Sequence, residues 1–337
     1  MKKRIAITIV SLLSCAALFA NGASEGQKSA GSSTDTSKPI TMKVGIGANA
    51  DSALGKGVVY FCDLIEKKSG GKLKAELYAS NMLGGDREMV EGVGMGTIEM
   101  ANIATGTVTN FSDKFFPLDL PYVVTSRERA YSVLDGPKGK AILDSLENSG
   151  IYAMNFWELG FRDLYNVRGP VAHPNELKGL KIRVMENDIY ITLINGLGAY
   201  ATPMSIGEVF TALQQKTIDG HDNPIGVTLA GKFYEADKYC TASHHVYSAT
   251  VSMISRQFFD SLPAEYRKWI VEADTEARDY ERKLVQDEEQ DAYKQWEANG
   301  GTVTQVDANE WANACKFVVD KYESRVDMDF VRELRGF

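Results

Sequence analysis

The feature that most constrains the fold of this chain is a regular alternation of strand-like and helix-like segments from Ile40 onward. The segment ITMKVGI alternates apolar with other residues, as a β-strand does, and GKGVVYFCDLIEKKSGG has helical periodicity ended by two glycines. The alternation continues through the strand-like segments KLKAELYA, TIEMANIA, IYAMNFWE, GLKIRVM and TIDGHDN and the helix-like segments DREMVEGVGMG, NDIYITLINGLG and GEVFTALQQ. Repeated β-α units predict an α/β protein with sheets covered by helices.

One long segment, residues 262–299, predicts a single helix. It has no Gly or Pro beyond Pro263 in its first turn, Ser261 is placed to cap it, and Gly300 and Gly301 end it. At 1.5 Å per residue this helix would be roughly 55 Å long, longer than one domain is wide. Because about 300 mature residues exceed what one core usually supports, we expect two lobes with this helix crossing both.

The first twenty residues have the pattern of an export signal peptide. Three basic residues precede an uncharged apolar run, residues 5–20, that is too short to span a membrane in a mature protein. Two processing routes stay open: Ala20 suits an ordinary signal peptidase, whereas LLSC resembles a lipobox in which Cys15 is acylated. Residues 21–38 are rich in Ser, Gly and Thr, which predicts a disordered tether and favours the lipid anchor slightly. Either route places the protein outside the cytoplasm, in the periplasm.

Charge and cysteine content argue against several classes of function. The formal net charge is −8, and loss of the basic signal peptide makes the mature protein more acidic, so we expect no nucleic-acid partner. Beyond Cys15 the chain has Cys62, Cys240 and Cys315, an odd number without paired spacing. We expect no disulfide framework and no zinc site, but three buried thiols.

Two further patterns give only weak indications of cofactor or catalytic chemistry. VGIGANA fits the loose dinucleotide fingerprint through Gly45 and Gly47, but the turn continues into DSALGKG before any helix begins. Asp219, His221 and Asp222 alternate along an extended segment, so their side chains are not expected to converge. No G-x-S-x-G nucleophile motif is present. We therefore expect no enzyme, no cofactor and no metal site.

Two arginines in apolar surroundings indicate an anion site. Arg162 in ELGFRDLYN and Arg183 in LKIRVMEN each lie near the end of a predicted strand. The alternative for each arginine alone is a surface ion pair with a covered stem. Two guanidinium groups at one end of a sheet could instead donate to a carboxylate in a fixed planar geometry.

Several stretches occur here in a characteristic order and spacing: KKSGGKLKAELYASNMLGGDREMVEGVGMGTIEMA, FPLDLPYVV, ELKGLKIRV and GLGAYATPMSIGEVFTALQQKTIDGHDNP. From about Met42 to Gly301 they resemble the solute-binding proteins of TRAP (tripartite ATP-independent periplasmic) transporters. The resemblance implies a two-lobed α/β fold of the periplasmic-binding-protein type, in which a cleft closes on a small organic acid. It also implies a monomer that delivers its ligand to membrane permease subunits.

The resemblance assigns ligand contacts in the second lobe. In the family, the arginine of the KIRV motif is the main carboxylate ligand, here Arg183, and the arginine of the GFR motif assists it, here Arg162. The asparagine of the DGQENP motif also contacts ligand. This chain reads DGHDNP, which keeps Asn223 but replaces the preceding pair by His221 and Asp222.

Further contacts are implied around these. In the first lobe, Asp86 in LGGDRE and Thr105 in NIATG occupy positions that often touch ligand. Glu186 and Ile206 do so in some members. Ile206 replaces an aromatic residue often found there, which puts ring stacking at this position in doubt.

The same resemblance suggests lobe boundaries and a ligand class. Lobe I is expected at 39–160 plus about 248–285, and lobe II at 161–247 plus about 286–337. The stretch RVMEND is more similar to members that bind sugar acids, so a uronate or aldonate is the expected ligand. Its polar residues 186–188 could accept hydrogen bonds from hydroxyls or cap the next helix. A C4-dicarboxylate, another monocarboxylate, or a sensor role toward a receptor are the alternatives.

Overall fold

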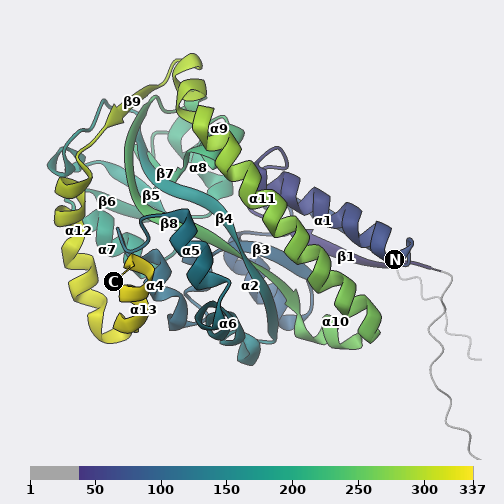
Figure 1. Ribbon diagram of the computed structural model, residues 1–337. Coiled ribbons are helices and arrows are strands. Elements are labelled where there is room, and N and C mark those ends of the chain that lie inside the picture. The colour runs from purple at the N-terminus through teal and green to yellow at the C-terminus, as the bar shows by residue number, and fades with distance from the viewer. Residues whose placement is uncertain (1–37, 337) are drawn as a thin grey trace, which may run out of the picture. The chain divides into compact units, whose positions relative to one another are not determined.

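A nine-stranded mixed sheet extends through residues 38–336, the part of the chain that the computed structural model describes (Figure 1). The predicted signal peptide, Cys15 and all of the predicted tether except Lys38 lie outside the described residues, so those expectations remain predictions. The strands are β1 (Ile40–Gly45), β2 (Leu73–Tyr78), β3 (Met100–Ala104), β4 (Ile151–Asn166), β5 (Lys181–Val184), β6 (Tyr200–Pro203), β7 (Gly220–Pro224), β8 (Tyr239–Ser255) and β9 (Thr302–Gln305).

The order of the strands is β2-β1-β3-β8-β4-β7-β5-β6, with β9 paired to β8. The sequence predicts separate sheets, but the long antiparallel pair β4 and β8 joins both halves into one. The end of β8 nearest Ser255 pairs with β3, and the end of β4 nearest Asn166 pairs with β7. β1–β3 and β5–β7 are therefore attached to opposite ends of the same strand pair.

The sequence predicted only the first half of β4 and did not delimit β8. Both strands are buried along most of their length, and β8 is rich in Ser and Thr, so neither shows the apolar alternation of a half-exposed strand. The β4–β8 register shifts at three places, between Ala153 and Asn155, between Glu158 and Gly160, and between Arg162 and Leu164. Such bulges bend and twist a strand, here where it passes from one half of the sheet to the other.

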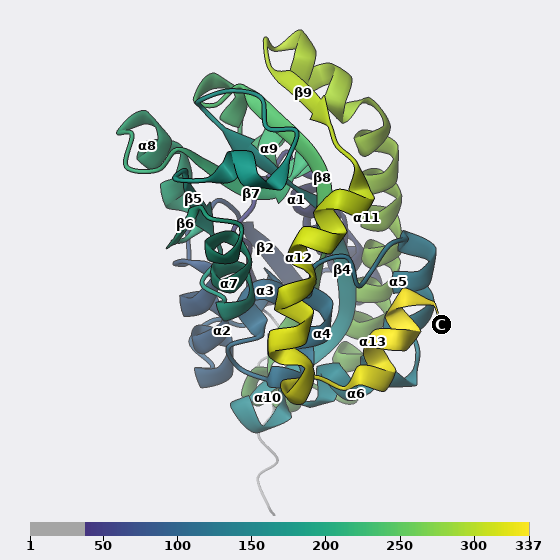
Figure 2. The same ribbon diagram turned by 90° about the vertical axis from the view of Figure 1, so that its left-hand side faces the viewer.

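The helices cover both faces of this sheet. They are α1 (Ala53–Ser69), α2 (Asp86–Met95), α3 (Thr105–Val108), α4 (Phe116–Asp119), α5 (Arg127–Leu134), α6 (Pro137–Asp144), α7 (Asp188–Gly196), α8 (Ile206–Gln214), α9 (Ile225–Ala230), α10 (Arg256–Ser261), α11 (Ala264–Ala298), α12 (Ala308–Tyr322) and α13 (Met328–Arg335). Figure 2 shows α12 against α7 and α13 against α5.

The predicted long helix is α11, whose 35 residues span roughly 52 Å and pack along α1, β4, α9 and β9 (Figure 1). Its predicted start is wrong. Ser261 is the last residue of α10 and does not cap α11, because Leu262 takes the extended conformation that a following proline favours. Pro263 is itself the N-cap residue of α11.

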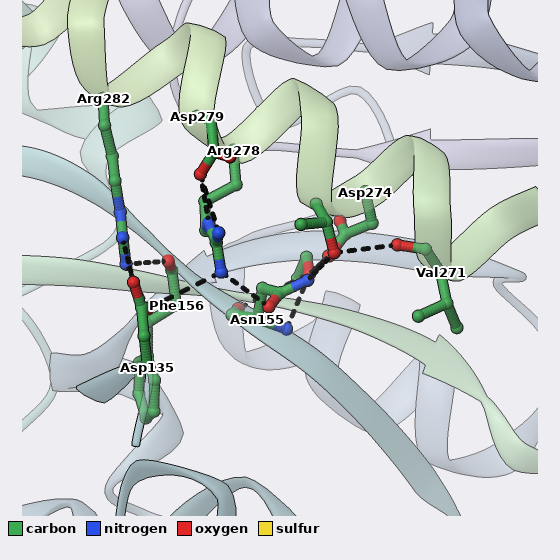
Figure 3. Close-up of polar contacts among 10 residues, drawn as sticks. Asp135, Asn155, Phe156, Val271, Asp274, Arg278, Asp279 and Arg282 are labelled. Atoms are coloured by element: carbon green, nitrogen blue, oxygen red, sulfur yellow. Dashed lines mark hydrogen bonds and ion pairs between the residues drawn. The ribbon is translucent and has the colours of Figure 1, made fainter. Parts of the chain in front are cut away.

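A row of polar side chains, of which Ser252, Asp274 and Arg282 are buried, connects α11 to its neighbours (Figure 3). Asn155 of β4 donates from Nδ2 to Asp274 Oδ2 over 2.7 Å, and its Oδ1 accepts from Arg278 Nη1 over 3.0 Å. Further along the helix, Arg282 donates to both carboxylate oxygens of Asp135. We call this group the α11 seam; its members are Asp135, Asn155, Ser252, Asp274, Thr275, Arg278 and Arg282.

The thiols agree in part with their prediction. Within residues 38–336, Cys62, Cys240 and Cys315 form no disulfide with one another; the last two are buried, whereas Cys62 is partly exposed. Within residues 38–336 we find no helix with the length and apolar character needed to cross a membrane.

Candidate ligand-binding site

Three neighbouring cavities share lining residues where the two halves of the sheet meet. The inner cavity, of about 40 Å³, is lined by Gly47, Ala48, Leu54, Asp86, Asn102, Ala104, Leu159, Arg162, Arg183, Met185, Ile206, Asn223, Val227 and Thr250. An acidic recess of about 160 Å³ shares Asp86, Arg183, Met185 and Ile206 with it. A neutral recess of about 190 Å³ shares Gly47, Ala48, Ile206 and Val227 with it. Six of the seven predicted site residues line at least one cavity.

Arg183, the third residue of β5, is 2 % exposed and has a free donor. Its Nε and Nη2 both donate to the carbonyl oxygen of Met204, over 2.9 and 2.7 Å, while Nη1 has no hydrogen-bond partner. Burial lowers the pKa of the guanidinium to about 10, and the neighbouring Arg162 contributes to this, although Asp222 and Asp86 act in the opposite direction. A buried cation with a free nitrogen facing a cavity is suited to bind an anion.

Arg162 lies at the same cavity but is already paired. Its Nε donates to Asp222 Oδ2 over 2.7 Å and its Nη2 to the Asp222 carbonyl over 2.6 Å, and its guanidinium lies over the ring of Tyr190. Burial raises the pKa of Asp222, but the Arg162 guanidinium and His245 outweigh burial and hold it well below its usual range. The two arginines therefore differ, since Arg162 has a carboxylate partner and Arg183 has none.

Asp86, the first residue of α2, faces Arg183 across the inner cavity. It is partly exposed, and its Oδ1 is buried without a hydrogen-bond partner. Burial raises the pKa of this carboxyl to about 6, although Arg183 lowers it. Gly47 leaves room for it, because a Cβ at this position would lie 2.4 Å from Asp86 Oδ1.

Of the four remaining residues predicted to contact ligand, three line a cavity and one does not. Asn223 of β7 lines the inner cavity, Glu186 lines the acidic recess, and Ile206 lines all three cavities. Thr105 lines none of them, and its hydroxyl donates to Asp119 Oδ1 over 3.1 Å. Its ligand contact stays a prediction without support from this geometry. Asn187 caps α7 by accepting from the backbone of Ile189, as the capping alternative expects.

Two cavity residues were not found from the sequence. Asn102 of β3 is 1 % exposed, and neither its amide oxygen nor its amide nitrogen has a partner. Thr250 of β8 is fully buried with an unpartnered hydroxyl. An asparagine in the apolar strand MANIA was an available signal for the first, whereas Thr250 is one of many hydroxyl residues in β8. Leaving such groups without partners costs about 1–3 kcal/mol each, so they are candidates to bind ligand.

The acidic residues of the DGHDN segment do not converge, as predicted. Asp219 pairs with Arg168 and Asp222 with Arg162, while His221 lies beside Asp237. Among the described residues 38–336, we find no group of three or more His, Cys, Asp or Glu that could hold a metal ion.

The model of the bacterial extracellular solute-binding protein family 7 (DctP) matches residues 44–325. The chain belongs to this family. The 2,3-diketo-L-gulonate-binding periplasmic protein YiaO of Escherichia coli is 35% identical over 257 residues, which cover 75% of this chain and 78% of YiaO. The resemblance inferred from the sequence motifs is thus confirmed.

Solved structures of the same family have the same fold. A TRAP periplasmic solute-binding protein of Bordetella bronchiseptica, with density attributed to pantoate, has a TM-score of 0.85 and 34% identity over 88% of this chain and 99% of its own. One from Polaromonas, bound to D-erythronate, has a TM-score of 0.85 and 32% identity over 88% of this chain and 98% of its own. The two-lobed α/β fold is therefore confirmed. The DctP family protein described here is an extracytoplasmic binding protein of the TRAP type for small organic acids.

Proposed function

We propose that this protein captures a hydroxylated monocarboxylate, a sugar acid such as an aldonate or a uronate, and delivers it to a TRAP membrane permease. The observation that carries the proposal is the free Nη1 of Arg183, a buried charged donor at the inner cavity. A ligand carboxylate would give it the partner that Asp222 already gives Arg162. In this proposal Arg183 is the main ligand-binding residue and Arg162 supports it.

The charges around the cavities favour one carboxylate over two. The acidic recess carries four acids, Asp86, Glu88, Glu186 and Glu208. The neutral recess has no charged side chain among its lining residues. The cations at the three cavities are Arg87, which pairs with Glu91, and the two arginines of the inner cavity. In the acidic recess a second carboxylate would meet four acids and one arginine that is already paired, and in the neutral recess it would meet only uncharged groups. This charge distribution disfavours the C4-dicarboxylate alternative.

Uncharged polar groups at the inner cavity suit ligand hydroxyls. Asn102 and Thr250 have unpartnered atoms, Asn223 lies beside them in the cavity lining, and Asp86 can accept from a hydroxyl. The acids named for the three relatives, a diketogulonate, a pantoate and an erythronate, each have one carboxylate with additional hydroxyl or keto oxygens. Another relative is named for C4-dicarboxylate binding, so the ligand class requires an experiment.

We further propose that binding closes two lobes with the boundaries expected from the sequence, 39–160 plus about 248–285 and 161–247 plus about 286–337. Contacts between the proposed lobes occur on two sides of the cavities. Asn49 Nδ2 donates to the carbonyl of Ala230 over 2.9 Å, and Asn110 Nδ2 donates to the carbonyl of Glu186 over 2.7 Å. The last helix, α13, contacts α5 and so bridges the proposed lobes. Ligand should then reduce the radius of gyration in small-angle scattering, and equal radii with and without ligand would argue against closure.

The ligand class can be tested with the purified protein. Mass spectrometry after denaturation would identify a copurified acid, and calorimetry would compare D-galactonate, D-galacturonate and D-erythronate with succinate and malate. We expect Asp86→Ala to weaken sugar-acid binding by roughly 1.5–3 kcal/mol, the scale of a hydrogen bond to a charged group. Under the dicarboxylate alternative the same change should leave the affinity equal or improve it, because it removes a repelling charge. Binding of succinate or malate and of no sugar acid would overturn the ligand class.

Transport and anchoring need separate tests. Uptake of the identified acid by cells that express this protein together with two membrane subunits would support delivery to a permease. If cells without the protein lose a receptor response to the acid but keep its uptake, the sensor role is favoured. The mass of the mature N-terminal peptide would decide between cleavage after Ala20 and acylation at Cys15.

A further inference from the structure

Asn223 is held from behind by a histidine and an aspartate that do not line the inner cavity. Its Nδ2 lies 3.0 Å from His221 Nδ1. His221 Nε2 lies 3.2 Å from Asp237 Oδ2, a close approach without the geometry of a hydrogen bond. His221 and Asp237 are fully buried and Asn223 is 5 % exposed.

The contacts of Asn223 select one orientation of its amide group. The carbonyl oxygen faces Arg162, whose Nη2 donates to it over 3.5 Å, and the amide nitrogen faces His221. Rotating the amide by 180° would place its N–H groups against the N–H groups of Arg162. An amide nitrogen can only donate, so His221 Nδ1 must accept.

The role of acceptor at Nδ1 fixes the tautomer of His221. A neutral imidazole has one protonated and one unprotonated nitrogen, so the proton lies on Nε2, beside the Asp237 carboxylate. The ring has little freedom to turn. It stacks on Tyr165 with ring centroids 4.8 Å apart and an interplanar angle of 14°, and Phe233 covers it at 4.8 Å.

We propose that His221, held by the rings of Tyr165 and Phe233 with its Nε2 beside the Asp237 carboxylate, is a positioning residue that holds the Asn223 amide in a single orientation toward the bound acid. The inference rests on the proposed function, because it assumes that Asn223 contacts the ligand. Without an acceptor at position 221 the amide can adopt both orientations, and only a fraction of the molecules then offers the ligand the correct one. His221 thereby contributes to affinity without touching the ligand.

The first test needs no ligand. Long-range ¹H–¹⁵N correlation spectra of histidine-labelled protein at pH 8 report the tautomer, and four histidines in the chain make assignment by His221→Gln simple. We expect the pattern of an Nε2-protonated ring in the wild type and a mixture of tautomers in Asp237→Asn. An Nδ1-protonated or doubly protonated His221 would overturn the proposal.

The second test is a double-mutant cycle with D-galactonate as the probe in calorimetry. We expect His221→Leu to weaken binding about tenfold and His221→Gln, which keeps an acceptor, to stay within about twofold of wild type. In an Asn223→Ala background, His221→Leu should cause no further loss. An equal loss in both backgrounds would show a merely structural role and overturn the proposal.

The experiments distinguish failure of the proposed ligand class from failure of the positioning role of His221. If D-galactonate does not bind the wild type, the proposed ligand class fails while the tautomer result still decides the orientation of His221. Thermal unfolding of His221→Leu checks the fold. If that variant does not fold, Asp237→Asn replaces it in the cycle, with the same expected loss of affinity only when Asn223 is present.

Discussion

The α11 seam and the inner cavity both contain polar side chains that are buried or partly buried, but they differ in their hydrogen bonding. In the seam, Asn155 uses both amide atoms, and Asp274 Oδ2 accepts from Asn155 and from Ser252 (Figure 3). In the inner cavity, neither amide atom of Asn102 has a partner. Satisfied polar groups hold elements together, whereas unsatisfied ones at a cavity mark a place where another molecule completes the bonds.

The pKa values of the carboxyl groups do not distinguish structural aspartates from candidate ligand-binding ones. Burial raises the pKa of Asp274 in the seam to about 6, and it raises the pKa of Asp86 at the cavity to about 6 as well. The Oδ1 atoms of both side chains are buried without a partner, but Asp274 Oδ2 accepts from two side-chain donors, Asn155 and Ser252. Hydrogen-bond partners, and not the pKa alone, separate the structural aspartate from the one that is a candidate to bind ligand.

The largest expected contrast is between the arginines of the two regions. Arg183→Ala should weaken ligand binding by roughly 2–5 kcal/mol with an unchanged or raised melting temperature, because the free protein loses a buried charge without a carboxylate partner. Arg282→Ala should lower the stability by about 1–3 kcal/mol without changing affinity, because it breaks the contact with Asp135. Calorimetry measures the ligand affinity of both variants, and thermal unfolding measures their melting temperatures.

Arg183→Lys is the matched control. We expect it to lose ligand binding as well, since the point charge of lysine does not replace the planar guanidinium donor. Unchanged affinity in Arg183→Ala would remove Arg183 from the site.

A smaller contrast should separate the two asparagines. Asn102→Leu should weaken sugar-acid binding by about 1–2 kcal/mol and stabilise the free protein slightly, because no protein partner is lost. Asn155→Leu should destabilise the protein by about 1–3 kcal/mol, because Asp274 and Arg278 each lose a partner, and should leave affinity unchanged. A clear loss of stability in Asn102→Leu would instead place this residue with the structural group.

An effect of similar size concerns the pH dependence of stability. The folded-state pKa of Asp86, about 6, lies above the ordinary value of 3.8, so its charged form destabilises the free protein. That destabilisation is fully present above about pH 6, declines as the pH falls, and is absent below about pH 4. Asp86→Asn should therefore raise the free energy of unfolding by about 1–2 kcal/mol at pH 8 and leave it unchanged at pH 4. Denaturant titrations at the two pH values measure this, and a gain of equal size at both would exclude the carboxyl group as its cause.

Local motifs in the sequence pointed to residues that the structure brings together at the candidate site. Arg162 lies within β4, Arg183 lies within β5 and Asp86 opens α2, and all three line the inner cavity. Their contact with ligand stays a prediction. The unpartnered state of Asn102 and Thr250 arises only when β3 pairs with β8, across some 150 residues of chain, and no local pattern reports it.

The fold, too, was predicted only in part from the sequence. The alternating segments and the long helix gave the α/β class, because amphipathic elements show their periodicity. The continuity of the sheet was missed, because β4 and β8 are buried on both faces and lack alternation. The misplaced cap at Ser261 reflects the preference of Leu262, the residue before a proline, for extended backbone.

The position of β8 between β3 and β4 also governs how the chain can fold. A nascent chain that ends at Asn166 already contains β1–β4, yet β3 and β4 are not neighbours and each needs β8 to complete its pairing. Until residue 255 is available, both strands would present open edges, which favour aggregation. The high contact order that results predicts slow folding. It also predicts that the two proposed lobes fold as one cooperative unit.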